Sequence, residues 1–152
     1  EPYFGRGIET LPPEVYSEMA GESAVATLKV EDKAFIEATT AVVKDLHQQG
    51  NVVILGRGAN VILADTPDVI HVGLLAPLDV RAETMMEREH LGREEAEEFA
   101  EELERARVAF FRKFFKVHPN DPSLYHIMLN MGKVQRQTAA EIIVHAAGDL
   151  VH

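Results

Sequence analysis

Three short apolar runs between residues 52 and 75 form the centre of the predicted fold. Val52–Leu55 and Val69–Leu75 are aliphatic and β-branched without polar alternation, which is typical of strands that helices cover on both faces. Between them, Ala59–Ala64 is ambiguous and could form a short helix that packs against the sheet. The turn Gly56-Arg57-Gly58 follows the first run. An arginine therefore lies just past the carboxyl end of a predicted strand, the edge at which open α/β sheets bind ligands.

Helical spacing of apolar residues surrounds this centre. We expect a further strand at Tyr125–Leu129 and helices at residues 31–49, Leu78–His90, 92–115 and Thr138–Ala147. Gly50 is a suitable residue to end the first of these helices. Alternating helices and strands predict an α/β fold with three layers, in which flanking helices cover a mostly parallel sheet.

Residues 1–30 are predicted to be an irregular connector that precedes one α/β domain at residues 31–150. The first 21 residues hold three of the seven prolines of the chain, which disfavour regular structure around them. Within the connector, Pro13–Met19 could form one or two helical turns, and Ala24–Val30 a short strand or an extended segment.

Composition excludes several classes of function. The net charge of -10 argues against binding to nucleic acid, because that binding needs a basic surface. No apolar run approaches the roughly 18–20 residues that span a bilayer. The chain has no cysteine, and its seven histidines show no metal-ligand spacing. We therefore expect no metal site from the sequence and no membrane partner, and we expect a cytoplasmic location.

The Gly56-Arg57-Gly58 turn is the first candidate for chemistry. Two glycines allow unusual backbone dihedrals and a close approach of the backbone to a ligand. The arginine between them offers a planar donor fork suited to phosphate or carboxylate. A tight turn that merely carries a surface arginine fits the same residues equally well.

Cations on the long predicted helix are the second candidate. Arg105 and Arg112 are seven residues apart, so they lie near one helical face and could clamp a polyphosphate. Alternatively, Arg105 and its neighbour Arg107 pair with nearby glutamates. Arg81 and Arg88 could share a face of the preceding helix in the same way. We expect Phe110, Phe111, Phe114 and Phe115 to pack in a core or an interface.

The order and spacing of five segments resemble the cytidylate kinase-like family, P-loop proteins of the nucleoside monophosphate kinase type. The segments are VVILGRGANVIL, HVGLLAPLDVR, ERARVAFFRKFF, DPSLYHIMLN and AAEIIVHA, and the similarity covers about residues 32–147. The resemblance implies a P-loop kinase-like fold, with a helical lid-like region at about residues 92–118.

It also implies transfer of a phosphoryl group from ATP, with Mg²⁺, to a nucleoside monophosphate such as CMP or dCMP. By this similarity Arg57, with Gly56 and Gly58, binds the monophosphate substrate. Arg81 lies near the base of ATP, and Arg105 and Arg112 are catalytic lid arginines that reach the transferring phosphates.

The chain departs from the family pattern at its beginning. It contains no Gly-x-x-x-x-Gly-Lys-Ser/Thr phosphate loop and no Ser-Gly-Gly variant of it, and Gly5-Arg6-Gly7 is too short and follows no apolar strand. We therefore expect the first strand, the phosphate loop and the hydroxyl linked to Mg²⁺ to be missing. The chain would be a fragment of a longer protein or a degenerate homologue, and not an efficient kinase alone.

Two functions remain open on this basis. The first is the body of a kinase whose parent protein supplies the missing loop. The second is a non-catalytic nucleotide-binding or regulatory module that assembles with another chain. Because a missing central strand exposes sheet edges, we also expect a homo-oligomer formed by dimerisation or strand exchange.

Overall fold

Two parallel strands form the sheet in the computed structural model of this protein, which describes residues 30–150. β1 (Val72–Leu75) pairs with β2 (Ile127–Asn130) in a register that places Val72 opposite Ile127 and Leu75 opposite Asn130. Two strands that are far apart in sequence and parallel require a long crossover. Helices α4 (Leu78–Glu89) and α5 (Arg93–Phe115) supply it.

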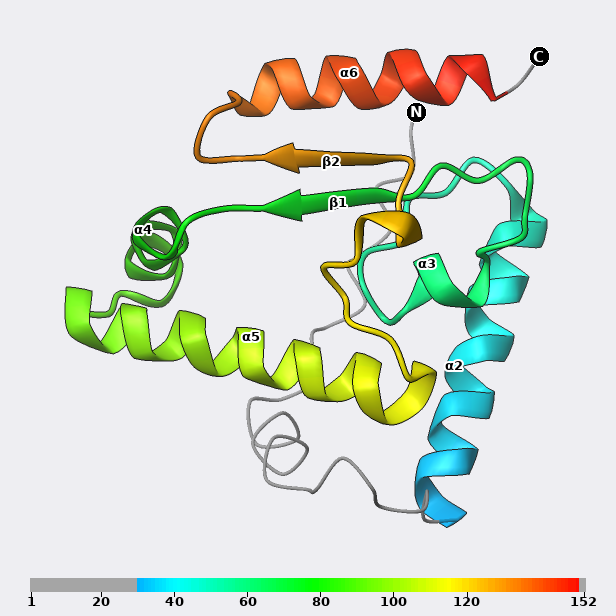
Figure 1. The fold of residues 1–152 in the computed structure, drawn as a ribbon, viewed down its shortest axis with the longest axis horizontal. Coiled ribbons are helices and arrows are strands. Elements are labelled where there is room, and N and C mark those ends of the chain that lie inside the picture. The colour runs from blue at the N-terminus through cyan, green and yellow to red at the C-terminus, as the bar shows by residue number, and fades with distance from the viewer. Residues whose placement is uncertain (1–29, 151–152) are drawn as a thin grey trace.

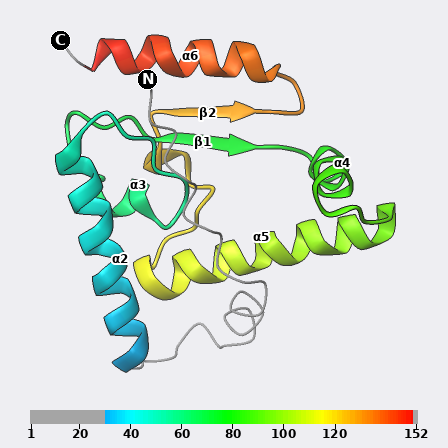
Figure 2. The same ribbon diagram turned by 180° about the vertical axis from the view of Figure 1, so that it is seen from behind.

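Three further helices complete the described chain. They are α2 (Val30–Gln49), α3 (Ala59–Ile62) and α6 (Arg136–Asp149), and a short 3₁₀ turn, η1 (Pro122–Leu124), precedes β2. Figures 1 and 2 show α6 on the β2 side of the sheet and α4 and α5 on the opposite side. The predicted helices are confirmed, and the ambiguous segment Ala59–Ala64 contains the short helix α3.

The end of α2 shows why the predicted boundary was correct. Gly50 adopts a φ of 69°, and its N–H donates to the carbonyl oxygen of His47 over 3.0 Å. Glycine enters this left-handed region without the steric penalty that a Cβ imposes. The acidic pair Glu31 and Asp32 lies in the first turn, where the helix dipole favours negative charge.

Buried side chains among residues 30–150 pack the helices against one another. Val43 of α2 is buried with Ala59 and Leu63, so α2 packs against the α3 segment. Ala82 of α4 and Ala96 of α5 are fully buried. Small side chains allow the backbones of α4 and α5 to approach closely, which fixes the direction in which α5 crosses the molecule (Figure 1).

The prediction of a strand at Val52–Leu55 is wrong for this structure. The segment lies outside every strand of the described chain, and the side chains of Val53 and Leu55 are 87% and 77% exposed. A strand is defined by hydrogen bonds to a neighbour, and no described segment pairs with these residues. The apolar composition predicts burial on both faces, whereas the structure leaves Val53 and Leu55 in solvent and packs only Ile54 against the core residues Val43, Ala59 and Leu63.

The two other strand predictions are confirmed with shifted limits. β1 begins at Val72 rather than Val69, and β2 runs from Ile127 to Asn130 rather than from Tyr125 to Leu129. Tyr125 instead caps η1, since its N–H donates to the carbonyl oxygen of Pro122 over 3.2 Å.

The α/β character and the parallel pairing of the prediction are confirmed. The sheet within residues 30–150 has only two strands, so it is smaller than predicted. Leu74 and Leu75 of β1 are 58% and 41% exposed, which contradicts the expectation of a strand covered on both faces. No helix among the described residues is long and apolar enough to cross a membrane. The predictions for Pro13–Met19 and for residues 24–29 lie outside the described chain, and Val30 begins α2.

Candidate functional site

All three residues of the Gly56-Arg57-Gly58 turn have a left-handed backbone conformation. Their φ angles are 69°, 59° and 69°, and the N–H of Ala59 closes the turn by donating to the carbonyl oxygen of Gly56 over 3.1 Å. Glycine tolerates this conformation, but for arginine it stores strain of about 1–3 kcal/mol. The expectation that the glycines permit unusual dihedrals is confirmed.

Arg57 differs from the other residues of this conformation. The described non-glycine residues with positive φ are Asn51, Arg57, His90 and Lys116. His90 and Lys116 cap the ends of α4 and α5, where left-handed residues are common, and Asn51 follows α2. Arg57 precedes a helix. The left-handed conformation of Arg57 is therefore not explained by the end of a helix. Backbone strain of this kind often occurs at functional sites.

The turn packs against the end of α5. A Cβ placed on Gly58 would lie 2.1 Å from Cε2 and 2.4 Å from Cζ of Phe115, so the phenyl ring occupies the space that any side chain would need. Figure 1 shows α3, which follows the turn, on the same side of the sheet as the end of α5. The structure thus brings the turn to the basic end of the helix that carries Arg112.

The cations of α5 have different surroundings. Arg105 is exposed, and its guanidinium lies 3.9 Å from the carboxylate of Glu101, one turn earlier. Arg112 is also exposed and lies one turn before Phe115. At 1.5 Å per residue, Arg105 lies about 15 Å from Phe115 along the helix. Arg112 is therefore the nearer of the two to the turn.

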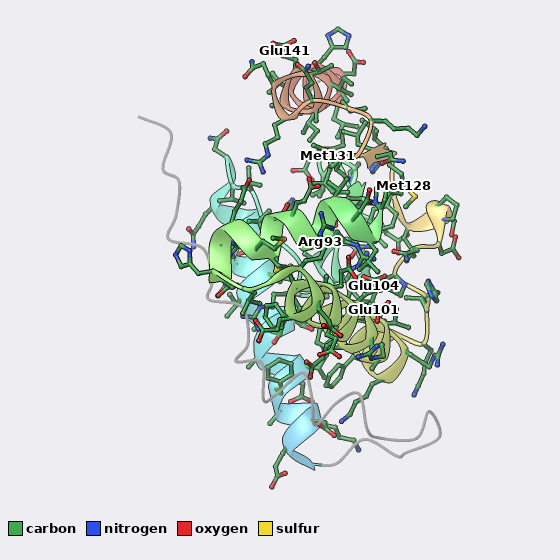
Figure 3. All side chains as sticks on the ribbon, turned by 90° about the vertical axis from the view of Figure 1, so that its left-hand side faces the viewer. Arg93, Glu101, Glu104, Met128, Met131 and Glu141 are labelled. Carbon is green, nitrogen blue, oxygen red and sulfur yellow. The ribbon has the colours of Figure 1, made fainter. Side chains whose placement is uncertain are left out.

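Two other cations of α5 hold the helix in place. Arg107 donates to Glu104 and, over 2.8 Å, to Oδ1 of Asn120, so it fixes the loop that follows α5. Lys113 lies 3.2 Å from the carboxylate of Asp32, and both side chains are largely buried. The alternative that arginines of this helix pair with glutamates is thus observed. Glu101 and Glu104 are labelled on α5 in Figure 3.

Arg81 is not part of this cluster. Its Nε donates to the carbonyl oxygen of Ala76 over 3.1 Å, and one terminal nitrogen donates to the carbonyl oxygen of Ala100 over 3.4 Å. Ala100 and Phe115 are 15 residues apart on α5, about 22 Å. Arg81 therefore links the loop after β1 to the middle of α5, and the structure does not bring it to the Gly56–Gly58 turn.

Asn60 is a polar residue of the turn region that no sequence pattern singled out. Its Nδ2 is buried and has no hydrogen-bond partner within the described structure, which is rare because an unpaired buried donor costs about 1–3 kcal/mol. Its only signal in the sequence is its position two residues after Gly58. Asn60 adds a second unusual feature to the same turn.

His71, which directly precedes β1, forms a hydrogen bond with the residue that ends α3. The side chain is 8% exposed, and its Nε2 lies 3.1 Å from the carbonyl oxygen of Leu63. Burial lowers the pKa of His71 from its usual 6.5; the hydrogen bond to Leu63 opposes this shift, and the charge of His126 adds to it. The imidazole is therefore neutral at pH 7 and acts as a donor to Leu63.

The loops that follow the two strands touch each other. Asn130 closes a tight turn, since its Oδ1 accepts a hydrogen bond from the N–H of Gly132 over 3.0 Å. A Cβ on Gly132 would lie 2.7 Å from Cδ of Pro77, the residue that precedes α4. The carboxyl ends of β1 and β2 are therefore in direct contact through their exit loops.

No preformed metal site occurs among residues 30–150. No group of three or more His, Cys, Asp or Glu side chains there could hold a metal ion. A shallow groove of about 350 Å³ lies along α2 and is lined by Ile36, Glu37, Thr40, Ala41 and Lys44, none of which is a predicted site residue.

Comparison with known proteins identifies the family. A model described as the cytidylate kinase-like family matches residues 4–133. The chain belongs to the cytidylate kinase-like family. The match begins earlier than the resemblance described above and ends before α6, so it includes residues 4–29 as well as the Gly56–Gly58 turn and both strands.

One relative carries the name of the family. The cytidylate kinase of Methanopyrus kandleri is 28% identical to this chain in an alignment over 116 residues, and the match covers 71% of this chain and 60% of that protein. The chain thus spans about 60% of the length of this relative.

A solved structure extends the comparison to the fold. The crystal structure of an uncharacterized protein from Eubacterium ventriosum matches with a TM-score of 0.69 and 23% identity, and the match covers 90% of this chain and 81% of that protein. This member of the cytidylate kinase-like family therefore shares an α/β fold with a known crystal structure.

Proposed function

We propose that this chain is the body of a nucleotide-binding domain that holds a nucleoside monophosphate of the CMP type at Arg57. The observation that carries the proposal is the strained, left-handed arginine between two glycines, packed against the basic end of α5. A guanidinium presented from such a turn can donate two parallel hydrogen bonds to a phosphate. Family membership and the named relative from Methanopyrus kandleri support the choice of ligand.

The cations of α5 have a second role in the proposal. Arg112, one turn from Phe115, and Arg105, two turns further back, would neutralise negative charge on phosphates transferred between ATP and the monophosphate. ATP would supply the phosphoryl group, and Mg²⁺ bound with ATP would supply positive charge that offsets the charge of its phosphates. We assign no Mg²⁺ ligand, because no described cluster fits one. The role of Arg81 near the base of ATP stays a prediction, since two of its donors contact backbone carbonyls.

A non-catalytic nucleotide-binding module that assembles with another chain is the second candidate. The observation that favours it is that Arg81 and Arg107 are engaged with the protein itself rather than directed at a common point. The sequence also has no glycine-rich phosphate loop. We expect this chain alone to bind the monophosphate without efficient phosphoryl transfer, because transfer depends on positioned phosphates and metal.

Calorimetric titration of the chain with CMP tests the binding proposal. Arg57→Ala should weaken binding by about 1.5–3 kcal/mol, the contribution of a hydrogen bond to a charged group, which is roughly 10- to 150-fold in Kd. Arg57→Gly provides a second variant, because it removes the guanidinium and relieves the backbone strain. Arg93→Ala is the matched control, since Arg93 is exposed and pairs with Glu83 and Glu97 at the other end of α5.

Two results would contradict the proposal. If CMP produces neither heat nor a thermal shift with the unmutated chain, this chain does not bind the ligand. If both Arg57 variants bind CMP as tightly as the Arg93 control, Arg57 is not the phosphate-binding residue. Phosphoryl transfer from ATP to CMP, followed by separation of CDP, then distinguishes the kinase from the non-catalytic module.

A further inference from the structure

The ring of Phe115 at the end of α5 occupies the space that a side chain on Gly58 would need. The hypothetical Cβ of Gly58 meets three atoms of this ring, at 2.1, 2.4 and 3.2 Å. Gly58 is buried, and it is the residue that directly follows the strained Arg57. The ring thus lies against the backbone of the turn, at the point where the chain leaves its left-handed conformation and enters α3.

The position of the Phe115 ring is fixed from within α5. Its centroid lies 5.8 Å from that of Phe110 and 5.7 Å from that of Phe111, at interplanar angles of 72° and 58°. Phe110 and Phe111 are each only 6% exposed. These edge-to-face and tilted contacts are the favoured geometries of aromatic pairs. Because the ring is held by its own helix, the helix determines where the turn can lie.

The end of α5 is in turn attached to α2. Lys113 pairs with Asp32, and the rings of Phe114 and Phe35 lie 5.7 Å apart. Phe114 and Phe115 therefore have different neighbours although they are consecutive. Phe114 contacts α2, whereas Phe115 contacts the turn.

From these contacts we propose that Phe115 is a positioning residue for Arg57. Its ring holds the Gly56–Gly58 turn in the left-handed conformation, so that Arg57 and the basic end of α5 form one rigid unit. This inference rests on the proposed function. If a nucleoside monophosphate binds at Arg57, its phosphate contacts an arginine whose position α5 has already fixed. It also means that a displacement of α5 releases Arg57, which couples the lid-like helix to the substrate side of the site.

The variants Phe115→Leu and Phe114→Leu test this inference as a matched pair. Both residues are half-buried in the last turn of α5, and both rings contact Phe110. Leucine preserves an apolar side chain but lacks the ring atoms that reach Gly58. We expect similar losses of thermal stability from the two variants. Phe115→Leu alone should weaken CMP binding at least tenfold, whereas Phe114→Leu should change it less than twofold.

Limited proteolysis tests the same inference in the absence of nucleotide. Trypsin can cut the bond between Arg57 and Gly58, and mass spectrometry follows the cutting of that bond alone. A turn held by Phe115 is cut slowly, because a protease needs an extended, mobile segment. We expect cutting at least fivefold faster in Phe115→Leu and unchanged in Phe114→Leu.

A third variant tests the contact itself. Gly58→Ala places a Cβ against the ring and should accelerate the same cut. In the Gly58→Ala/Phe115→Leu double variant the colliding ring atoms are gone, and only the strain of alanine at a φ of 69° remains. The acceleration of cutting should therefore be smaller than the product of the two single-variant accelerations. Multiplicative effects in the double variant would show that Gly58 and Phe115 act independently and would overturn the inference.

The remaining outcomes separate the inference from the proposed function. If the unmutated chain does not bind CMP, the proposed function fails, and the rate of cutting after Arg57 alone decides whether Phe115 holds the turn. If CMP binds and the two leucine variants lose affinity equally, the proposed function stands and the positioning role of Phe115 is refuted. Equal cutting rates in the two variants refute it as well.

Discussion

The backbone N–H of His71 donates a hydrogen bond to Nδ1 of His126 over 2.9 Å, and the two imidazole rings stack with their centroids 5.3 Å apart. The backbone N–H of His126 donates to the carbonyl oxygen of His71 over 2.8 Å. These reciprocal bonds connect the starts of β1 and β2. In the first of these bonds Nδ1 of His126 is the acceptor, so the hydrogen bonds hold the two imidazole rings together at the starts of both strands.

The burial of His71 should make the protein less stable in mild acid. Because burial lowers the pKa of His71 below its unfolded value of 6.5, the unfolded chain binds the proton more readily than the folded chain. The stability that the neutral imidazole contributes is fully present above pH 6.5 and is lost as the pH falls through the lowered folded pKa. Urea unfolding at pH 7.5 and at pH 5.5 measures this loss.

A pair of histidine variants assigns that pH dependence. His71→Gln should be less stable at pH 7.5 but should lose less stability on acidification than the unmutated chain. His145→Gln, at an exposed position of α6, should retain the full pH dependence. Equal acid sensitivity in all three proteins would contradict the assignment to His71.

Arg81→Ala should destabilise the protein by about 1.5–3 kcal/mol, the contribution of one hydrogen bond from a charged group, because the bond to Ala76 is the shorter of its two and the bond to Ala100 is long at 3.4 Å. Arg88→Ala on the same helix removes an exposed charge, and its effect should stay within about 0.5 kcal/mol. Urea unfolding compares the two. A fully stable Arg81→Ala protein with impaired ATP binding would instead assign this arginine to the nucleotide.

Asn60→Leu should leave the free energy of unfolding unchanged or raise it by up to about 1 kcal/mol, because the substitution removes a buried donor that has no partner. Asn120→Leu is the contrast, since the amide of Asn120 contacts both Glu104 and Arg107, and we expect a loss of about 1 kcal/mol or more. Thermal unfolding of both variants checks this. A clear loss in Asn60→Leu would indicate a partner for its amide.

The exposed apolar residues of the sheet edge predict self-association. Leu74 and Leu75 of β1 and Val53 and Leu55 of the unpaired segment are all more than 40% exposed, and unpaired apolar edges are sites of strand pairing between chains. Sedimentation velocity should show a concentration-dependent dimer, which we expect Leu74→Lys to dissociate. Val144→Lys, at an exposed site on α6, should leave the dimer intact. A monomer at all concentrations would refute self-association.

The helices of this fold could be predicted from the sequence because their signals are local. Apolar spacing, the acid at the start of α2 and the glycine at its end all lie within the helix or next to it. The strand prediction at Val52–Leu55 failed for the opposite reason. Whether an apolar run becomes a strand depends on a partner elsewhere in the chain, and composition does not reveal whether that partner is present.

The candidate site was predicted in part. The Gly-Arg-Gly pattern indicated an unusual turn, and helical spacing placed Arg105 and Arg112 on one face. The sequence could not show that Phe115 fills the space beside Gly58, since that contact joins residues 57 positions apart. Nor could the sequence show that Arg81 donates to backbone carbonyls. Residue type alone does not distinguish an arginine that connects two helices by hydrogen bonds from one that binds a ligand.

The contact between Gly132 and Pro77 has a mechanical consequence for this edge of the sheet. Pro77 leads directly into α4, and the turn at Gly132 leads within a few residues into α6. With no gap between the two loops, one helix cannot tilt at its base without displacing the other. A ligand that displaced either loop would therefore shift both α4 and α6, which lie on opposite sides of the sheet.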